Sequence, residues 1–129
     1  MKLTNNDIFA VSSAINEIDS NDKIIVNFKT AFRLAVIVEE LSSYISVFEN
    51  SKNEIVKEVF GDDFEKMTND DELAKHPKYN DLVQKINELS LEEVELKTQE
   101  LTNEMIESIE GPASMSIIFG LKKLIKTED

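Results

Sequence analysis

The side chains in this sequence that could catalyse a reaction match no recognised catalytic arrangement in their spacing. His76 is the single histidine, and cysteine is absent. Neither a two-histidine metal site nor thiolate chemistry can therefore form within one chain. A nucleophile needs a base beside it, and the hydroxyl groups nearest to His76 in the sequence, on Thr68 and Tyr79, lie in no known pattern with it. His76 is more readily explained as a loop residue in front of Pro77.

Acidic residues offer oxygen atoms for calcium or for acid–base chemistry. Residues 19–23 and 69–72 are rich in Asp and Asn, but neither stretch has the glycine at the sixth position or the spaced glutamate of an EF-hand loop. Glu92, Glu93 and Glu95 could supply a glycosidase pair, yet neighbouring side chains on a strand point to opposite faces. The three glycines are isolated, so no phosphate-binding loop is present. We expect a protein that is not an enzyme and binds no metal or cofactor.

Length and charge limit the classes of function that remain. The chain has 129 residues, enough for one domain (1–129), and its 26 acidic and 14 basic side chains give a net charge of −12. This charge repels phosphate backbones and anionic lipids, so direct binding to nucleic acid or membrane is disfavoured. No apolar run approaches the roughly 18 residues of a membrane span, and the first residues lack the apolar core of a signal peptide. We expect a protein of the cytoplasm.

The chain is organised around a long run of apolar residues spaced alternately three and four apart. They are Ala31, Leu34, Val38, Leu41, Ile45, Phe48, Ile55 and Val59. This spacing predicts one helix over residues 29–60, with an apolar seam that only Lys52 interrupts. Gly61 follows as the residue that ends the helix. Such a helix is about 48 Å long, which exceeds the width of a globule of this size.

Shorter helices are predicted on both sides of the long one. Their starts are marked by Thr4, Pro77, Thr102 and Ser114. Thr4 and Asp7 have the spacing of a capping box, and the first helix is expected to run to about Ile18. The acidic stretch 62–76 is predicted to be a loop or weak helix at the tip of a hairpin. The last helix is expected to reach Ile125.

Two segments have the character of strands. Residues 23–28 are β-branched or aromatic at most positions, and residues 91–98 alternate apolar and charged side chains around Val94 and Leu96. An isolated strand needs a partner, so we expect these two to pair. The predicted fold is therefore mainly α: a long helical hairpin with a small two-stranded antiparallel ribbon at its base and short N- and C-terminal helices.

Several segments carry a resemblance to known proteins. They are Lys2-Leu3-Thr4-Asn5, Ile25-Val26-Asn27-Phe28-Lys29, Asn87-Glu88-Leu89-Ser90-Leu91-Glu92-Glu93-Val94-Glu95-Leu96 and Gly111-Pro112-Ala113-Ser114. Together with the order of the elements, they resemble a family of small, uncharacterised proteins encoded by tailed phages of Gram-positive bacteria. The resemblance implies a phage or prophage origin and a role in virion assembly or in dealing with the host. It implies no catalytic residues.

Two classes of function fit these features. In the first, the protein is a non-enzymatic protein–protein interaction module, an assembly or accessory factor that binds another phage or host protein in the cytoplasm of the bacterial host. In the second, it is an acidic inhibitor that imitates a nucleic acid and enters the basic channel of a host defence nuclease. Salt distinguishes them, because binding to a basic channel weakens steeply as salt rises whereas apolar docking changes little.

The apolar seam also raises a hypothesis of self-association. A helix over residues 77–90 is about 21 Å long, and from the base ribbon we expect it to cover the long helix only to about Tyr44. The candidate interaction residues beyond that point are Phe48, Lys52, Ile55 and Val59. A second copy could cover them in a symmetric homodimer of antiparallel long helices. In the alternative, cover comes from the tip itself, by Phe64, Met67 and Leu73.

Overall fold

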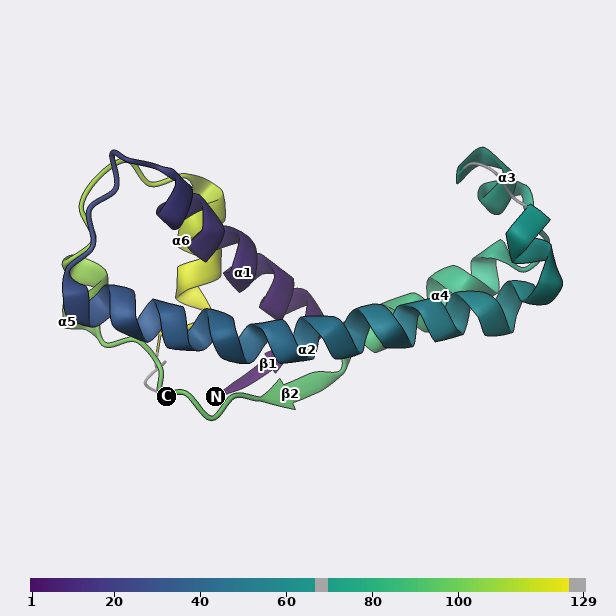
Figure 1. Cartoon of the computed structure of the whole chain (residues 1–129), viewed down its shortest axis with the longest axis horizontal. Helices are drawn as coiled ribbons and strands as arrows, with labels where there is room; N and C mark the ends of the chain where they lie inside the picture. Colours follow the sequence, from purple (N-terminus) through teal and green to yellow (C-terminus); the bar gives the residue numbers. More distant parts are fainter. Residues whose placement is uncertain (67–69, 126–129) are drawn as a thin grey trace.

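The computed structural model describes residues 1–66 and 70–125 and places them in an elongated, mainly helical molecule (Figure 1). The elements in chain order are β1 (Lys2–Thr4), α1 (Asn5–Ser20), α2 (Phe28–Phe60), the 3₁₀ helix η1 (Gly61–Lys66), α3 (Asp70–Lys75), α4 (Tyr79–Leu91), β2 (Glu93–Glu95), α5 (Asn103–Glu107) and α6 (Met115–Lys122). The predicted class, mainly α with a long helix and a two-stranded antiparallel sheet, is confirmed. No helix among the described residues is both long and apolar enough to cross a lipid bilayer.

Helix α1 begins where the sequence predicted. The Thr4 side chain accepts a hydrogen bond from the Asp7 amide, and the Asp7 carboxylate accepts one from the Thr4 amide. This capping box satisfies amides that a helix start leaves without partners. The buried face of α1 then joins the main core through Ile8, Val11, Ile15 and Ile18.

Helix α2 is the predicted long helix and contains 33 residues. Asn27 caps it by accepting a hydrogen bond from the Thr30 amide. Gly61 ends it with φ at 57°, a conformation that residues with a side chain rarely adopt. Both the extent of the helix and its stop are therefore confirmed.

The two-stranded sheet is built from other segments than expected. Strand β1 pairs antiparallel with β2, with Leu3 opposite Val94. The predicted pairing of residues 23–28 with residues 91–98 is wrong, because the first of these segments is mostly the loop before α2 and only Ile25 forms a bridge, to Glu110. The neighbours of Ile25 on both sides pack against the main core, so this apolar run is accommodated without a strand partner.

Helix α4 packs on the far part of α2, starting at the tip of the hairpin (Figure 1). A small second core joins Val59 and Phe60 to Leu82, and Leu73 of α3 packs against it. The start of α4 therefore lies beside the end of α2. This corrects the expectation that α4 would cover α2 from its first turns only to about Tyr44.

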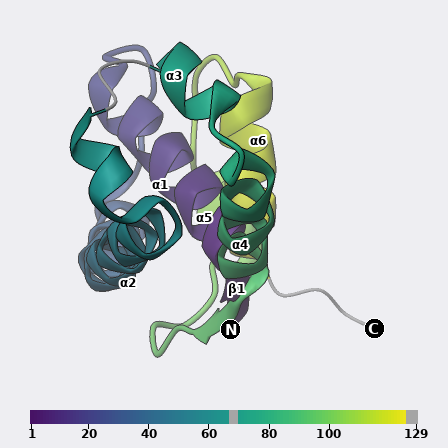
Figure 2. The same cartoon turned by 90° about the vertical axis from the view of Figure 1, so that its right-hand side faces the viewer.

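Helices α5 and α6 begin after Thr102 and Ser114, as predicted, and each of these side chains accepts a hydrogen bond from the amide three residues on. Helix α6 ends at Lys122, before the predicted Ile125, which instead forms a bridge with Leu101. Figure 2 shows α1 between α2 and α6, and α1 packs on both helices. The main core thus lies between α1 and these two helices.

Candidate functional site

The candidate interaction residues of the seam lie largely inside the molecule. Phe48 is only 8% exposed, and its ring meets that of Phe9 edge to face, with the centroids 4.9 Å apart. Val59 is 4% exposed and belongs to the small core with Leu82. The expectation that Phe48 and Val59 lie uncovered is therefore wrong, because α1 and α4 both pack on α2.

The other two seam residues, Lys52 and Ile55, are half-buried, and Ile55 packs against the small core. The tip was expected to cover the end of the seam through Phe64, Met67 and Leu73. Leu73 does pack against the small core, whereas the side chains of Phe64 and Met67 lie outside the described part of the structure. These seam residues form no exposed apolar face. The homodimer through the seam stays a prediction, without the uncovered surface that motivated it.

An exposed apolar ridge lies instead on the first turns of α2. We define the ridge as Phe28, Phe32 and Val36, which are spaced four residues apart on one side of the helix. Phe28 is 84% exposed and Phe32 is 62% exposed, and their ring centroids lie 6.2 Å apart. Aromatic rings make large contacts when a partner covers them, so the ridge is a candidate interaction surface.

The buried face of α2 positions the ridge. Thr30, Leu34 and Ile37 are buried, and helical geometry turns Phe32 by roughly half a circle away from that face. The hydroxyl groups of Thr30 and Ser108 also lie 3.0 Å apart in a hydrogen bond, which helps to fix the rotation of α2 about its axis. Sequence reasoning missed the ridge because it followed the seam alone. The available signal was a second apolar repeat at positions 28, 32 and 36.

Polar side chains of α2 hold the end of β2 and the segment that follows it, residues 95–100, against the helix. They are Arg33, Glu40 and Tyr44. Glu40 accepts hydrogen bonds from the amides of Lys97 at 2.6 Å and Thr98 at 3.0 Å, and from the Thr98 hydroxyl at 2.7 Å. Arg33 donates a hydrogen bond to the backbone carbonyl of Glu100 at 2.9 Å, and the Tyr44 hydroxyl donates one to the carbonyl of Glu95 at 2.8 Å. Residues 96–100, which are neither helix nor strand, are thereby fixed by α2.

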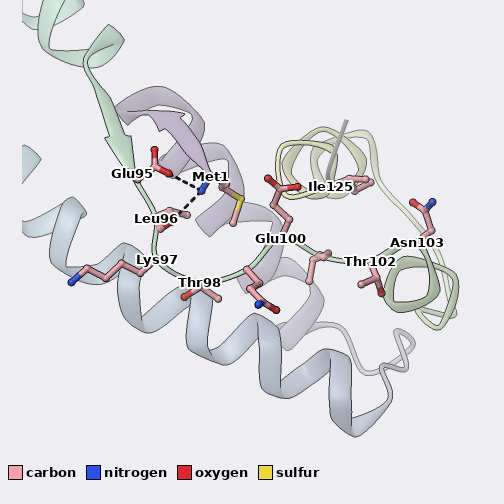
Figure 3. A pocket seen from close by; sticks show the side chains of 11 residues that line it. Met1, Glu95, Leu96, Lys97, Thr98, Glu100, Thr102, Asn103 and Ile125 are labelled. Carbon is pink, nitrogen blue, oxygen red and sulfur yellow. Dashed lines mark hydrogen bonds and ion pairs between the residues drawn. The ribbon is translucent and has the colours of Figure 1, made fainter. Parts of the chain in front are cut away.

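A pocket of about 700 Å³ opens beside this segment (Figure 3). At its edge, the amino group of Met1 donates to the Glu95 carboxylate at 3.2 Å and to the Leu96 carbonyl at 3.1 Å. Glu100 also lines the pocket, and its Oε2 atom is buried and has no hydrogen-bond partner among the described residues. Neither histidine nor serine is present among the lining residues, so Glu100 has no such partner here for nucleophilic catalysis.

The hydrogen bonds to Glu40 also change its acidity. Burial raises the pKa of this carboxyl group, but the hydrogen bonds from Lys97 and Thr98 outweigh burial, and the pKa lies below its ordinary value of 4.5. A carboxyl group whose pKa is lowered by folding stabilises the folded state above its unfolded pKa. This contribution disappears as the pH falls through the lower, folded pKa.

Glu40→Gln is therefore expected to reduce the free energy of unfolding at neutral pH and to do so less in acid. Hydrogen bonds to a charged group are worth about 1.5–3 kcal/mol, and partial exposure of Glu40 reduces the expected loss to about 1 kcal/mol. Urea unfolding from pH 7 down to about pH 3 measures this difference. Glu39→Gln, at an exposed neighbouring position, is the control. A loss for Glu40→Gln that does not shrink with acid would contradict the lowered pKa.

His76 lies at the tip of the hairpin, where its ring contacts neighbouring residues. Its Nε2 atom lies 3.1 Å from Asp63 Oδ2, and its Nδ1 atom accepts a hydrogen bond from the Lys78 amide. The ring also packs edge to face on Phe60, with the centroids 4.8 Å apart. Because Nδ1 is the acceptor, the neutral ring carries its proton on Nε2 and donates it to Asp63. Both ring nitrogen atoms are thus engaged in contacts within the tip.

The described residues contain no group of three His, Cys, Asp or Glu side chains able to hold a metal ion. The arrangement they do provide is an exposed apolar ridge on a helix whose opposite face is buried. Comparison of the chain with known protein families, curated proteins and solved structures finds no match.

Proposed function

We propose that this protein is a non-enzymatic protein–protein interaction module that docks through the ridge. The exposure of Phe28 and Phe32, at 84% and 62%, is the observation that carries the proposal. Burying one such side chain contributes about 1.5–3 kcal/mol. A partner that covers both rings would therefore gain substantial affinity from a small area.

The proposed partner is another phage or host protein in the bacterial cytoplasm, with an apolar groove that has basic edges. An apolar groove is the surface into which the apolar side of a helix such as α2 docks. Basic edges follow from the net charge of −12, because opposite charge on a partner steers encounter and favours the correct orientation. A module of this kind suits an assembly or accessory factor of a phage.

A second candidate function is inhibition of a host defence nuclease by imitation of a nucleic acid. The same net charge of −12 favours it. Carboxylates rather than aromatic rings would then carry the binding, and the affinity would fall steeply as the salt concentration rises. The two candidates therefore differ both in the residues they need and in their response to salt.

The ridge is tested by replacing its two rings together. Tagged wild-type protein is expected to capture a partner from phage-infected cells, and the variant with Phe28→Ser and Phe32→Ser is expected to lose it. Val47→Ser is the matched control, since Val47 is also 62% exposed on α2 but lies about three turns beyond Val36. Thermal unfolding checks that the variants remain folded.

The outcome separates the two candidate functions. Loss of capture only in the double variant, at low and high salt alike, supports docking through the ridge. Capture that survives the double variant but disappears at high salt supports the nuclease inhibitor and contradicts the proposal.

A further inference from the structure

Helices α1 and α2 diverge toward the loop that joins them (Figure 1). Residues of both helices line a groove of about 510 Å³. Its floor is apolar, with Ile15, Leu34 and Val38 among the lining residues. On the α2 side the groove is lined by Ala31 and Ala35, which are small and exposed. Because these side chains are small, the side chains of another helix have room to reach the apolar floor of the groove.

Two carboxylate groups lie at one end of this groove. Asp19 and Asp22 line it and are exposed. They lie at the C-terminal end of α1, where the helix dipole is also negative, and α1 has no basic residue in its last turn. Among the described residues, no lysine or arginine forms an ion pair with either carboxylate. A basic group from outside would therefore be stabilised at this end.

A surface with complementary properties lies on α6 of the same chain. Met115, Ile118 and Phe119 are 64%, 47% and 55% exposed. With the exposed Lys122, these side chains follow the spacing i, i+3, i+4, i+7 by which a helix presents anchors to a groove. The α6 stripe, as we call these four residues, thus ends in a positive charge. Its opposite face is fixed to the protein by the buried Ile117 and Leu121.

We propose that the α6 stripe of one copy docks in the α1–α2 groove of a second copy of this chain. The three apolar side chains of the stripe lie on the apolar floor, and Lys122 lies beside Asp19 and Asp22. The occupant is assigned as a second copy because the chain itself carries both surfaces, both are exposed, and their charges are opposite. This contact does not use the ridge, and of the seam it uses only the first residues, Ala31, Leu34 and Val38.

The contact is heterologous, because it joins two different surfaces. Figure 2 shows α6 on one side of α1 and α2 on the other, so a copy docked by its stripe still presents its own groove to a further copy. Heterologous contacts continue into open chains or close into rings. Wild-type protein is therefore expected to grow beyond a dimer as its concentration rises.

The test uses one variant for each surface and measures mass by light scattering from micromolar to millimolar concentration. Phe119→Asp removes the stripe and Ala35→Asp blocks the groove, and both positions are exposed, so each variant is expected to stay folded with an unchanged melting temperature. Each variant alone is expected to be monomeric, with self-association weakened at least tenfold. An equal mixture is expected to form only a 1:1 dimer, since one variant keeps its groove and the other keeps its stripe.

A charge exchange tests the polar part of the contact. Lys122→Glu alone is expected to weaken association at least tenfold, and the addition of Asp19→Lys and Asp22→Lys in the same chain is expected to restore it. A wild-type protein that stays monomeric at millimolar concentration would overturn the inference, as would a mixture of the first two variants that stays monomeric.

The same measurement on the variant with Phe28→Ser and Phe32→Ser keeps this inference separate from the proposed function. Unchanged self-association of that variant supports the contact between stripe and groove. Self-association that is lost in that variant, but kept in Phe119→Asp and Ala35→Asp, would place the contact at the ridge and overturn the inference.

Discussion

Replacing Gly120 by alanine is expected to lower the free energy of unfolding by about 3 kcal/mol, the upper part of the usual range for overpacking. Gly120 of α6 lies against α1, on which α6 packs. A Cβ atom there would overlap the Cβ of Ala14 and would lie 2.8 Å from the carbonyl oxygen of Ala10. Neither of these atoms can rotate away, so the two helices would have to move apart. The main core between them would then lose contacts.

Urea unfolding measures this loss, with Gly61→Ala as the comparison. Among the described residues, no heavy atom lies within 4 Å of a Cβ added at Gly61, so its replacement should cost only the strain of a backbone with φ 57° and ψ −135°, about 1–3 kcal/mol. In an unhindered helix, exchange of glycine for alanine instead gains about 1 kcal/mol. A Gly120→Ala protein as stable as the wild type would therefore contradict the close crossing of α1 and α6.

Elements that depend on neighbouring residues were predictable from the sequence. Helix α2 has nearly the predicted bounds, because its apolar spacing persists over many turns and Gly61 stops it. Thr4, Thr102 and Ser114 cap helices as predicted. A side chain that caps a helix acts on an amide two or three residues away, so the sequence alone contains the necessary information.

Pairings between distant residues were not predictable in the same way. Strand β1 has three residues, too few to show an alternation, and its partner lies about 90 positions away in the register of Leu3 with Val94. The apolar residues 23–28 were assigned to the ribbon because they were the only strand candidate apparent in the sequence. In the folded protein they serve the main core and the start of α2.

The candidate site, like the fold, was predictable only in its local features. The seam was recognised, but its exposure depended on how α1 and α4 pack on α2, and the assumed ribbon gave the wrong overlap of α4 with α2. Phe48 and Val59 are consequently buried rather than available. The ridge arises from the same helix, but its exposure becomes evident only once the buried face of α2 is known.

Phe48→Ala is expected to lower the free energy of unfolding by about 3–5 kcal/mol, the usual loss for a buried aromatic side chain. Phe48 is 8% exposed, and its ring contacts that of Phe9. Alanine would leave a cavity between α1 and α2 and remove this edge-to-face contact. The loss is a large share of the roughly 5–15 kcal/mol that stabilise a typical domain.

The adjacent residue supplies the control, because Val47 is 62% exposed on the same helix. Val47→Ala is expected to change the free energy of unfolding by no more than about 0.5 kcal/mol. Urea midpoints of the two variants at low protein concentration provide the comparison. If Phe48 were instead an uncovered seam residue, its replacement would alter association and leave the stability of the monomer nearly unchanged. Equal urea midpoints for Phe48→Ala and Val47→Ala would therefore contradict the burial of Phe48. They would instead support the seam as a docking surface.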